Sequence, residues 1–133
     1  MAAIKNYSYD LEERLARLAE RVIDLMKKLP NNGINMRMIP QLVASVGSSC
    51  TNYDEANEAE SKKDFRHKIC IVNKELRESK SWLRLLARAN PEFISEFREL
   101  WQEAHELKLI FSKIKKIMQL IFVLRTITRR AKN

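Results

Sequence analysis

The sequence predicts an all-α protein: one domain spanning residues 1–133, in which four antiparallel helices pack up-down-up-down as a left-handed bundle. Apolar residues recur with 4-3 spacing in four separate stretches, which is the pattern of helices packed along one seam. Only two glycines and three prolines occur, so few turns are expected and an all-β fold is disfavoured. The 3.5-residue period of the seams favours left-handed packing at a shallow crossing angle.

The first two helices are expected over residues 10–29 and 35–60. Asp10 and Glu13 can form a capping box at the start of the first helix. Small polar residues dilute the second helix, which makes it the weakest of the four. The predicted seams are Leu11, Leu15, Leu18, Val22, Leu25 and Leu29 in the first helix, and Ile39, Val43, Val46, Cys50 and Tyr53 in the second.

The last two helices are expected over residues 61–89 and 91–128, and a basic tail at residues 125–133 overlaps the end of the last helix. Ser61 and Asp64 can form a second capping box, and Asn90-Pro91 supplies an N-cap and a first-turn proline. The predicted seams are Phe65, Ile69, Val72, Leu76, Ser79, Leu83 and Leu86 in the third helix, and Phe93, Phe97, Leu100, Ala104, Leu107, Phe111, Ile114, Met118 and Ile121 in the fourth.

The fourth helix is too long for the rest of the bundle. At 1.5 Å per residue it would span roughly 57 Å, against roughly 42 Å for the third helix. Its apolar end must therefore be disordered, fold back or be covered by other subunits. Further apolar residues flank the seams and indicate either subunit contacts or a wider core stripe; they are Trp82, Leu85, Trp101, Ile110, Ile117 and Leu124.

The net charge of +8 is unevenly distributed along the chain. Residues 1–60 hold seven Lys and Arg against nine Asp and Glu, whereas residues 61–133 hold eighteen against eight. From Leu107 to Asn133 there are eight basic residues and no acid. So steep a gradient suggests an anionic partner, although charge that keeps the protein soluble is the alternative.

The order of several short motifs resembles a known family. The motifs are a small-polar run ending in Asn52, then Glu55-Ala56, Ser61 with Asp64-Phe65, Lys68, Glu75 and Trp82-Leu83, and later the stretch EAHELKLIFSKIKK. Together they resemble the bacterial four-helix-bundle family of 23S rRNA intervening-sequence proteins over roughly residues 8–116. Cys50 and Ser49 depart from the family pattern, and residues 117–133 extend past the usual family end.

This resemblance implies a bundle that assembles as a homopentameric ring and is encoded within insertions of bacterial large-subunit rRNA genes. Accessory proteins of diversity-generating retroelements look similar in shape. Those proteins are basic pentamers that bind a reverse transcriptase and nucleic acid. We therefore expect a non-enzymatic homo-oligomer that binds structured RNA or rRNA, with an adaptor for a protein partner such as a reverse transcriptase as the alternative.

The predicted RNA-binding residues lie where the third helix starts and the fourth helix ends, because an up-down bundle brings these segments to one end. Lysines and arginines there would neutralise phosphates. No aromatic residues interleave with them, so recognition of an RNA backbone is favoured over stacking on bases. The residues are Lys62, Lys63, Arg66, Lys113, Lys115, Lys116, Arg125, Arg129, Arg130 and Lys132.

Other functions find less support in the sequence. Arg98 and His105 match the loose Arg-x(4–6)-His pattern of the helical ribonucleases called HEPN domains, but four nearby glutamates would repel a phosphate. Neither histidine has the Glu-x-x-His spacing of di-iron bundles, so no metal or cofactor is expected. Asn52, Glu55 and Asp64 are expected to be structural, with Asn52 and Glu55 forming buried or interfacial hydrogen bonds.

Two cysteines, Cys50 and Cys70, give no disulfide framework and could face each other as reduced thiols. They indicate a reducing, cytoplasmic setting. No signal peptide is visible, and the longest apolar run, Ile117 to Leu124, falls far short of the ~20 residues that cross a bilayer. No membrane partner is therefore expected.

Overall fold

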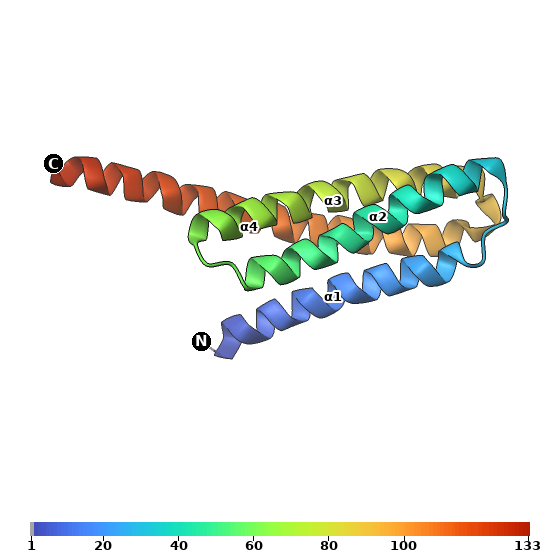
Figure 1. The fold of residues 1–133 in the computed structure, drawn as a ribbon, viewed down its shortest axis with the longest axis horizontal. Coiled ribbons are helices and arrows are strands. Elements are labelled where there is room, and N and C mark those ends of the chain that lie inside the picture. Colours follow the sequence, from blue (N-terminus) through green and yellow to red (C-terminus); the bar gives the residue numbers. More distant parts are fainter. Residues whose placement is uncertain (1) are drawn as a thin grey trace.

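The computed structural model describes the backbone of residues 2–133 and the side chains of residues 10–133, and it forms four long helices (Figure 1). Each helix runs back along the one before it, and no strand occurs in this part of the chain. The prediction of an all-α chain with four helices is confirmed. The elements are α1 (Ala2–Met26), α2 (Gly33–Asn57), α3 (Lys62–Ala89), the short 3-10 turn η1 (Pro91–Phe93) and α4 (Ile94–Lys132).

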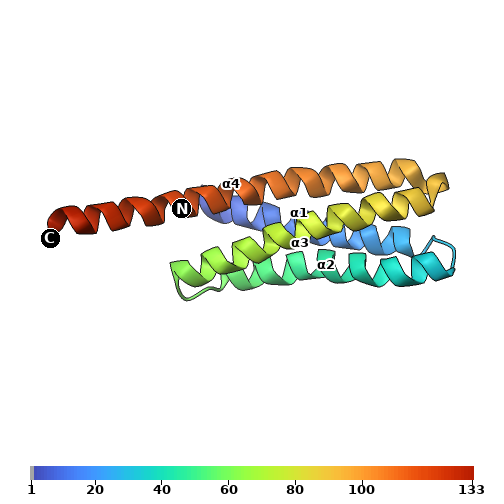
Figure 2. The same ribbon diagram turned by 90° about the horizontal axis from the view of Figure 1, so that it is seen from above.

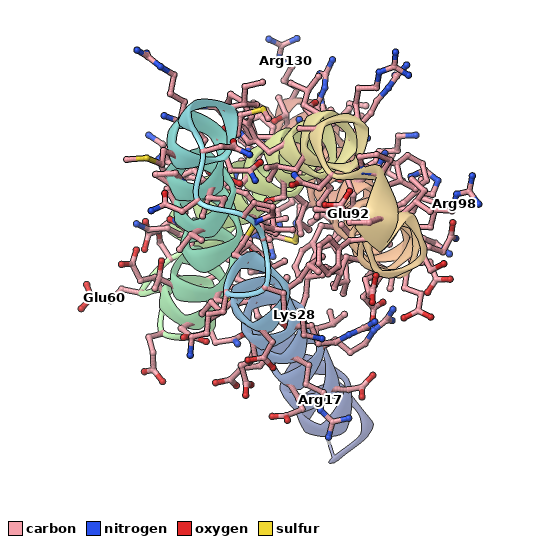
Figure 3. The ribbon with its side chains drawn as sticks, turned by 90° about the vertical axis from the view of Figure 1, so that its right-hand side faces the viewer. Arg17, Lys28, Glu60, Glu92, Arg98 and Arg130 are labelled. Atoms are coloured by element: carbon pink, nitrogen blue, oxygen red, sulfur yellow. The ribbon has the colours of Figure 1, made fainter. Side chains whose placement is uncertain are left out.

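The helices surround a single core. Contacts join α1 to α2, α2 to α3, α3 to α4 and α4 back to α1, so each helix has two neighbours. The end-on view in Figure 3 shows this four-cornered arrangement. Towards its N-terminus α1 diverges from the other helices (Figure 1). No helix within residues 2–133 is long and apolar enough to cross a membrane.

Two helix starts test the predicted capping boxes. The prediction for α1 is wrong, because the helix already begins at Ala2 and Asp10 lies within it. No proline or glycine occurs between residues 2 and 9, so nothing there interrupts the helix. The prediction for α3 is confirmed at its N-cap: the Ser61 hydroxyl accepts a hydrogen bond from the Asp64 backbone N–H at 3.0 Å.

The seams of α1, α3 and α4 are buried as predicted from the 4-3 spacing. Phe65, Phe93, Ile114 and Met118, at the seam ends, are only half-buried, and Ile121 is exposed. Phe111 forms the last fully buried layer of α4, where its ring meets that of Tyr53 edge-on with centroids 5.1 Å apart. The regular apolar spacing therefore correctly identified the core-facing side of three helices.

The predicted seam of α2 is wrong in part. Val43 is exposed and Cys50 half-buried, while Leu42, Ser45 and Ser49 are buried. The physical reason is the close contact with α3, where the hydroxyl oxygens of Ser45 and Ser79 lie 2.8 Å apart. Small serine side chains allow the two helices to approach closely. Each hydroxyl donates to a carbonyl of its own helix, so its burial leaves no polar group without a hydrogen-bond partner.

A pair of buried asparagines ties together the two connections at one end of the bundle. Asn35 and Asn90 exchange side-chain amide hydrogen bonds of 2.9 and 2.8 Å, and Asn35 also donates to the Pro30 carbonyl. The prediction that Asn90 caps the fourth helix is wrong, because its side chain turns into the core and bonds to Asn35 and the Leu86 carbonyl. Pro91 does occupy the first turn.

At the opposite end α4 projects well beyond the other helices (Figure 2). We call residues 117–132 the α4 extension. It neither folds back nor loses its helical form, and every side chain in it except half-buried Met118 is exposed. At 1.5 Å per residue its sixteen residues span roughly 24 Å. The extension thus carries apolar and basic side chains away from the bundle.

Candidate nucleic-acid interface

Basic residues gather at the end of the bundle from which α4 projects. We call this set the basic cluster. All of its members are exposed except Arg66, which is half-buried. Three come from the first turns of α3 and seven from the second half of α4: Lys62, Lys63, Arg66, Lys113, Lys115, Lys116, Arg125, Arg129, Arg130 and Lys132.

Two contacts between α3 and α4 set the register of this cluster. The Asn73 amide donates to the Ser112 hydroxyl at 2.7 Å, and the Arg66 guanidinium carbon lies 5.3 Å from the centroid of the Phe122 ring. The first turns of α3 therefore lie level with the base of the α4 extension. Lys113 and Lys116 lie along α4 between these two contacts. The structure thus brings together the α3 residues and the nearer α4 lysines.

The remaining basic residues and the nearby acids have a different placement. Arg129, Arg130 and Lys132 lie at the far end of the extension, beyond the other helices. At the contact between α2 and α3, Lys68 and Glu55 form an ion pair with an N–O distance of 2.6 Å. The hydrogen bond that the Lys68 ammonium donates to Glu55 raises the pKa of Lys68. Glu55 therefore neutralises a lysine outside the basic cluster.

A second group of polar side chains surrounds His105, halfway along the bundle. Its Nδ1 lies 2.8 Å from the Lys80 ammonium, and its ring stacks on Trp101 with centroids 5.0 Å apart. Lys80 also lies over the Trp101 ring at 4.7 Å, and burial lowers the pKa of Lys80. Sequence reasoning missed Lys80, which lies on another helix 25 residues away and has no motif linking it to His105.

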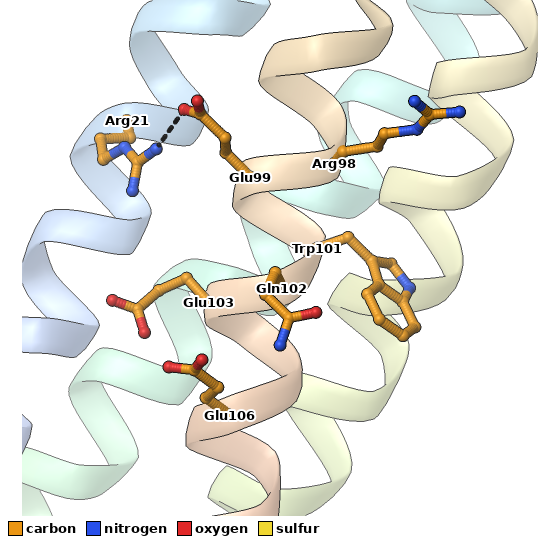
Figure 4. A pocket seen from close by; sticks show the side chains of 7 residues that line it. All are labelled: Arg21, Arg98, Glu99, Trp101, Gln102, Glu103 and Glu106. Atoms are coloured by element: carbon orange, nitrogen blue, oxygen red, sulfur yellow. Dashed lines mark hydrogen bonds and ion pairs between the residues drawn. The ribbon is translucent and has the colours of Figure 1, made fainter.

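Three glutamates of α4, Glu99, Glu103 and Glu106, lie on the side of the helix that faces α1. In Figure 4, Arg98 and Trp101 lie on the α3 side of α4, whereas Glu99 and Glu103 lie on the α1 side. Glu99 pairs with Arg21 at 3.2 Å, and Arg14 pairs with Glu103 and with Glu106. The Glu103 hydrogen bond raises the pKa of Arg14. Three of the four glutamates expected to repel a phosphate therefore form ion pairs across the α1–α4 contact, and all three line one groove together with Arg98.

Two grooves flank α4 near the connection end. The groove towards α1 has a volume of about 720 Å³ and is lined mainly by the glutamates and Arg21. The groove towards α3 has a volume of about 850 Å³, with an apolar floor that includes Leu85, Ile94 and Trp101. Arginines line the second groove as well: Arg84, Arg88 and Arg98. Arg98 points outward from the bundle (Figure 3).

The six residues predicted to flank the seams divide into two classes. Trp82, Trp101 and Ile110 are half-buried and pack against the core, as a wider core stripe requires. The other three are exposed and available to a partner: Leu85, Ile117 and Leu124.

The predicted structural polar residues lie at or near the α2–α3 turn. The Asn52 amide bonds within its own helix, to the Ser48 carbonyl at 2.9 Å and to the Ser48 hydroxyl at 3.0 Å. Glu55 is exposed, and its partner Lys68 comes from α3. Asp64 contributes its backbone N–H to the α3 cap.

Both cysteines are free and half-buried. The Cys50 thiol donates to the Leu15 carbonyl of α1 at 3.2 Å, and burial raises its pKa. Cys50 is therefore directed at α1. Among the residues whose side chains are described, no three His, Cys, Asp or Glu residues lie close enough together to hold a metal ion.

Comparison with known proteins identifies the family. The family model for the 23S rRNA-intervening sequence protein matches residues 9–113. The chain belongs to this family. A crystal structure of a protein of unknown function from the S23 ribosomal protein family of Bacteroides thetaiotaomicron is also similar. Its sequence is 28% identical and its TM-score is 0.73, with 80% of this chain and 98% of that chain covered. No curated protein matches the sequence. The α4 extension lies beyond the matched residues of the family model.

Proposed function

We propose that this 23S rRNA-intervening sequence protein is a non-enzymatic homo-oligomer that binds structured RNA through the basic cluster. The observation that carries the proposal is the gathering of ten lysines and arginines, nine of them exposed, at the end of the bundle where α4 contains no acid after Glu106. The family's link to rRNA supports RNA as the anionic partner and the cytoplasm as the location.

The chemistry of the cluster favours contacts with the RNA backbone. Exposed ammonium and guanidinium groups displace the counterions of phosphates, which gives salt-dependent affinity with little sequence preference. Phe122 is the only aromatic side chain within residues 112–133; it is 60% exposed, and the Arg66 guanidinium lies over its ring at 5.3 Å. Stacking on bases is therefore a minor contribution, and shape recognition of folded RNA fits better.

We further propose that the chain is a left-handed, up-down-up-down bundle whose copies form a homopentameric ring. The family resemblance supports this assembly, and exposed Ile117 and Leu124 offer apolar surface for it. A ring would repeat the basic cluster, so several weak contacts with one RNA would add up to a strong one.

The proposal is tested by titrating the protein with a structured RNA at two salt concentrations. Replacing Lys113, Lys115 and Lys116 by glutamine should weaken binding at least about tenfold at low salt and reduce its salt dependence, because about three phosphate contacts are lost. The matched control removes three exposed cations at the opposite end of the bundle: Lys27→Gln, Lys28→Gln and Arg37→Gln. Equal loss in the two triple variants, or no binding even at low salt, would overturn the proposal.

The absence of catalysis is tested in the same samples. The RNA should remain intact after prolonged incubation, because His105 is already engaged by Lys80 and Trp101. Cleavage by the wild-type protein that disappears in His105→Ala would instead assign the helical ribonuclease activity to Arg98 and His105.

The arginine-lined groove favours a second candidate function. An adaptor would bind a protein partner, such as a reverse transcriptase, through apolar side chains and acidic groups that fit this groove between α3 and α4. Leu85→Glu would then abolish capture of that partner while leaving RNA affinity unchanged. The same substitution should have no such effect if the RNA contact is the main function.

A further inference from the structure

The polarity of the core-facing side of α4 changes within the extension. The core seam of Leu107, Phe111 and Ile114 continues at the same 4-3 spacing through the apolar Met118 and Ile121, and then through Arg125, Thr128 and Lys132. The side of the helix that is apolar inside the bundle is therefore basic towards the tip of the extension. Such a surface cannot return to the bundle's own core, because burying unpaired charges is costly.

The apolar side chains of the extension form a seam of their own. They recur at intervals of three, four, three and four residues, at Ile117, Leu120, Leu124, Ile127 and Ala131. This is the a/d pattern of a coiled coil, maintained over two heptads. The four large members of this seam are 49%, 58%, 53% and 58% exposed, so no side chain among residues 10–133 covers them.

The charged residues of the extension suit a helix partner along this seam. Arg125 and Lys132 occupy b positions and Arg129 an f position, all of which face solvent in a coiled coil. Only Arg130 falls at a flanking g position. The other residues flanking the seam are Ile121, Val123 and Thr128, which widen the apolar face.

The extension is also held in a fixed rotation about its axis. Phe122 falls at an f position, on the side opposite the apolar seam, and lies under the Arg66 guanidinium of α3 at 5.3 Å. This contact turns the basic side of the helix towards the chain's own bundle. The apolar seam therefore faces outward, where a second molecule can reach it.

We infer that the α4 extension packs in parallel against the same segment of neighbouring copies of this chain, as a short coiled coil. An antiparallel pair would bring Arg129, Arg130 and Lys132 of one copy beside Lys113 and Lys116 of the other, where like charges repel. In the parallel arrangement the bundles lie at the same end, and the arginines at b and f positions point away from the shared apolar seam. The inference relies on the proposed homo-oligomer but not on RNA binding.

Disulfide trapping in the absence of RNA tests the parallel seam. With Leu124→Cys, the a-position thiols of two copies should meet, and mild oxidation should yield covalent dimers. Thr126→Cys is the matched control, since residue 126 lies at a c position only two residues away. We expect at least about fivefold more dimer from the first variant, because a-position side chains face each other in parallel coiled coils. The wild type supplies the background from Cys50 and Cys70.

A second substitution shows whether apolar packing brings the thiols together. Adding Leu120→Glu to Leu124→Cys should abolish trapping, whereas adding Thr126→Glu should not. All of these positions are exposed, so the bundle should fold in every variant.

Other outcomes would overturn the inference. They are equal trapping at positions 124 and 126, trapping between Ile117→Cys and Ile127→Cys but not between two copies of Leu124→Cys, and a one-chain mass for the wild type. Phosphatidylglycerol vesicles that shield the introduced thiol of Leu124→Cys from a thiol reagent, with no trapping, would replace the second copy by a lipid surface. Loss of RNA binding alone would leave the inference intact.

Discussion

The two ends of the bundle differ in how far contacts within the chain cover their side chains. At the connection end, the α1–α2 and α3–α4 turns are tied to each other by Asn35 and Asn90, and their polar groups find partners within the chain. At the other end, α4 continues as an extension whose large apolar side chains are exposed, with no contact from the side chains of residues 10–110 that buries them. One end is closed by contacts within the chain, whereas the other leaves large apolar side chains exposed. The same helix, α4, is continuous between them.

The largest expected effect contrasts a buried and an exposed apolar residue of α4. Phe111→Ala should lower the free energy of unfolding by about 3–5 kcal/mol, because it removes a fully buried ring that packs on Tyr53. Leu120→Ala should cost less than about 0.5 kcal/mol in dilute protein. Urea denaturation measures both values. A cost for Leu120→Ala that rises with protein concentration would indicate that a second molecule covers this residue. Equal costs for the two variants at high dilution would contradict the expected difference between buried and exposed positions.

The next effect concerns the connection end. Asn35→Ala should cost about 1–3 kcal/mol, because it leaves the buried Asn90 amide without a side-chain partner. The double variant Asn35→Ala with Asn90→Ala should cost less than the sum of the single changes. Asn31→Ala, at an exposed position in the same connection, is the control. Additive costs in urea denaturation would show that the two amides do not depend on each other.

A smaller effect is expected at the α2–α3 turn, on the side of the basic cluster. Ser61→Ala should cost about 1 kcal/mol, because it removes the acceptor for the Asp64 N–H at the start of α3. Ser81→Ala, exposed within the same helix, should be neutral or slightly stabilising. Thermal unfolding of both variants gives the comparison. No difference between them would mean that the first turn of α3 is already frayed in the native protein.

The smallest effect depends on pH. Burial raises the pKa of Glu75 above its ordinary value of 4.5, with a further contribution from Glu78. The native state then holds this proton more tightly than the unfolded state, so stability falls as the pH rises above 4.5. Glu75→Gln should therefore stabilise the protein by a few tenths of a kcal/mol at pH 7, a modest value because the group is only partly buried. Urea denaturation at pH 7 and pH 4 measures the difference, which should vanish at the lower pH.

The sequence predicted those parts of the fold that depend on apolar spacing. The seam from Leu11 to Leu25 in α1, Leu29 just after that helix, and the seam from Ile69 to Leu86 in α3 are buried where the 4-3 pattern places them. The pattern failed in α2, because the Ser45–Ser79 contact depends on small size and on a partner helix, neither of which periodicity records. It failed again at Asn90, where a tertiary hydrogen bond to Asn35 replaced a local cap.

In the candidate site, too, some features could be predicted from the sequence and others could not. The gathering of the basic cluster followed from an up-down chain path together with the charge distribution. The rotation of the extension could not be predicted, because the Arg66–Phe122 contact joins residues 56 positions apart through a helix packing angle. Lys80 beside His105 was missed for the same reason.

The continuity of α4 also fixes the distance between the bundle and the tip of the α4 extension. No proline, glycine or turn separates Phe111 in the last core layer from Lys132 near the tip, so the helix offers no natural joint. A group bound at the tip is held at a fixed height of roughly 20–25 Å above the bundle and at a fixed angle around its axis. Inserting or deleting two residues near position 117 would rotate the tip by about 200° with little change in reach, which separates the effect of angle from that of length.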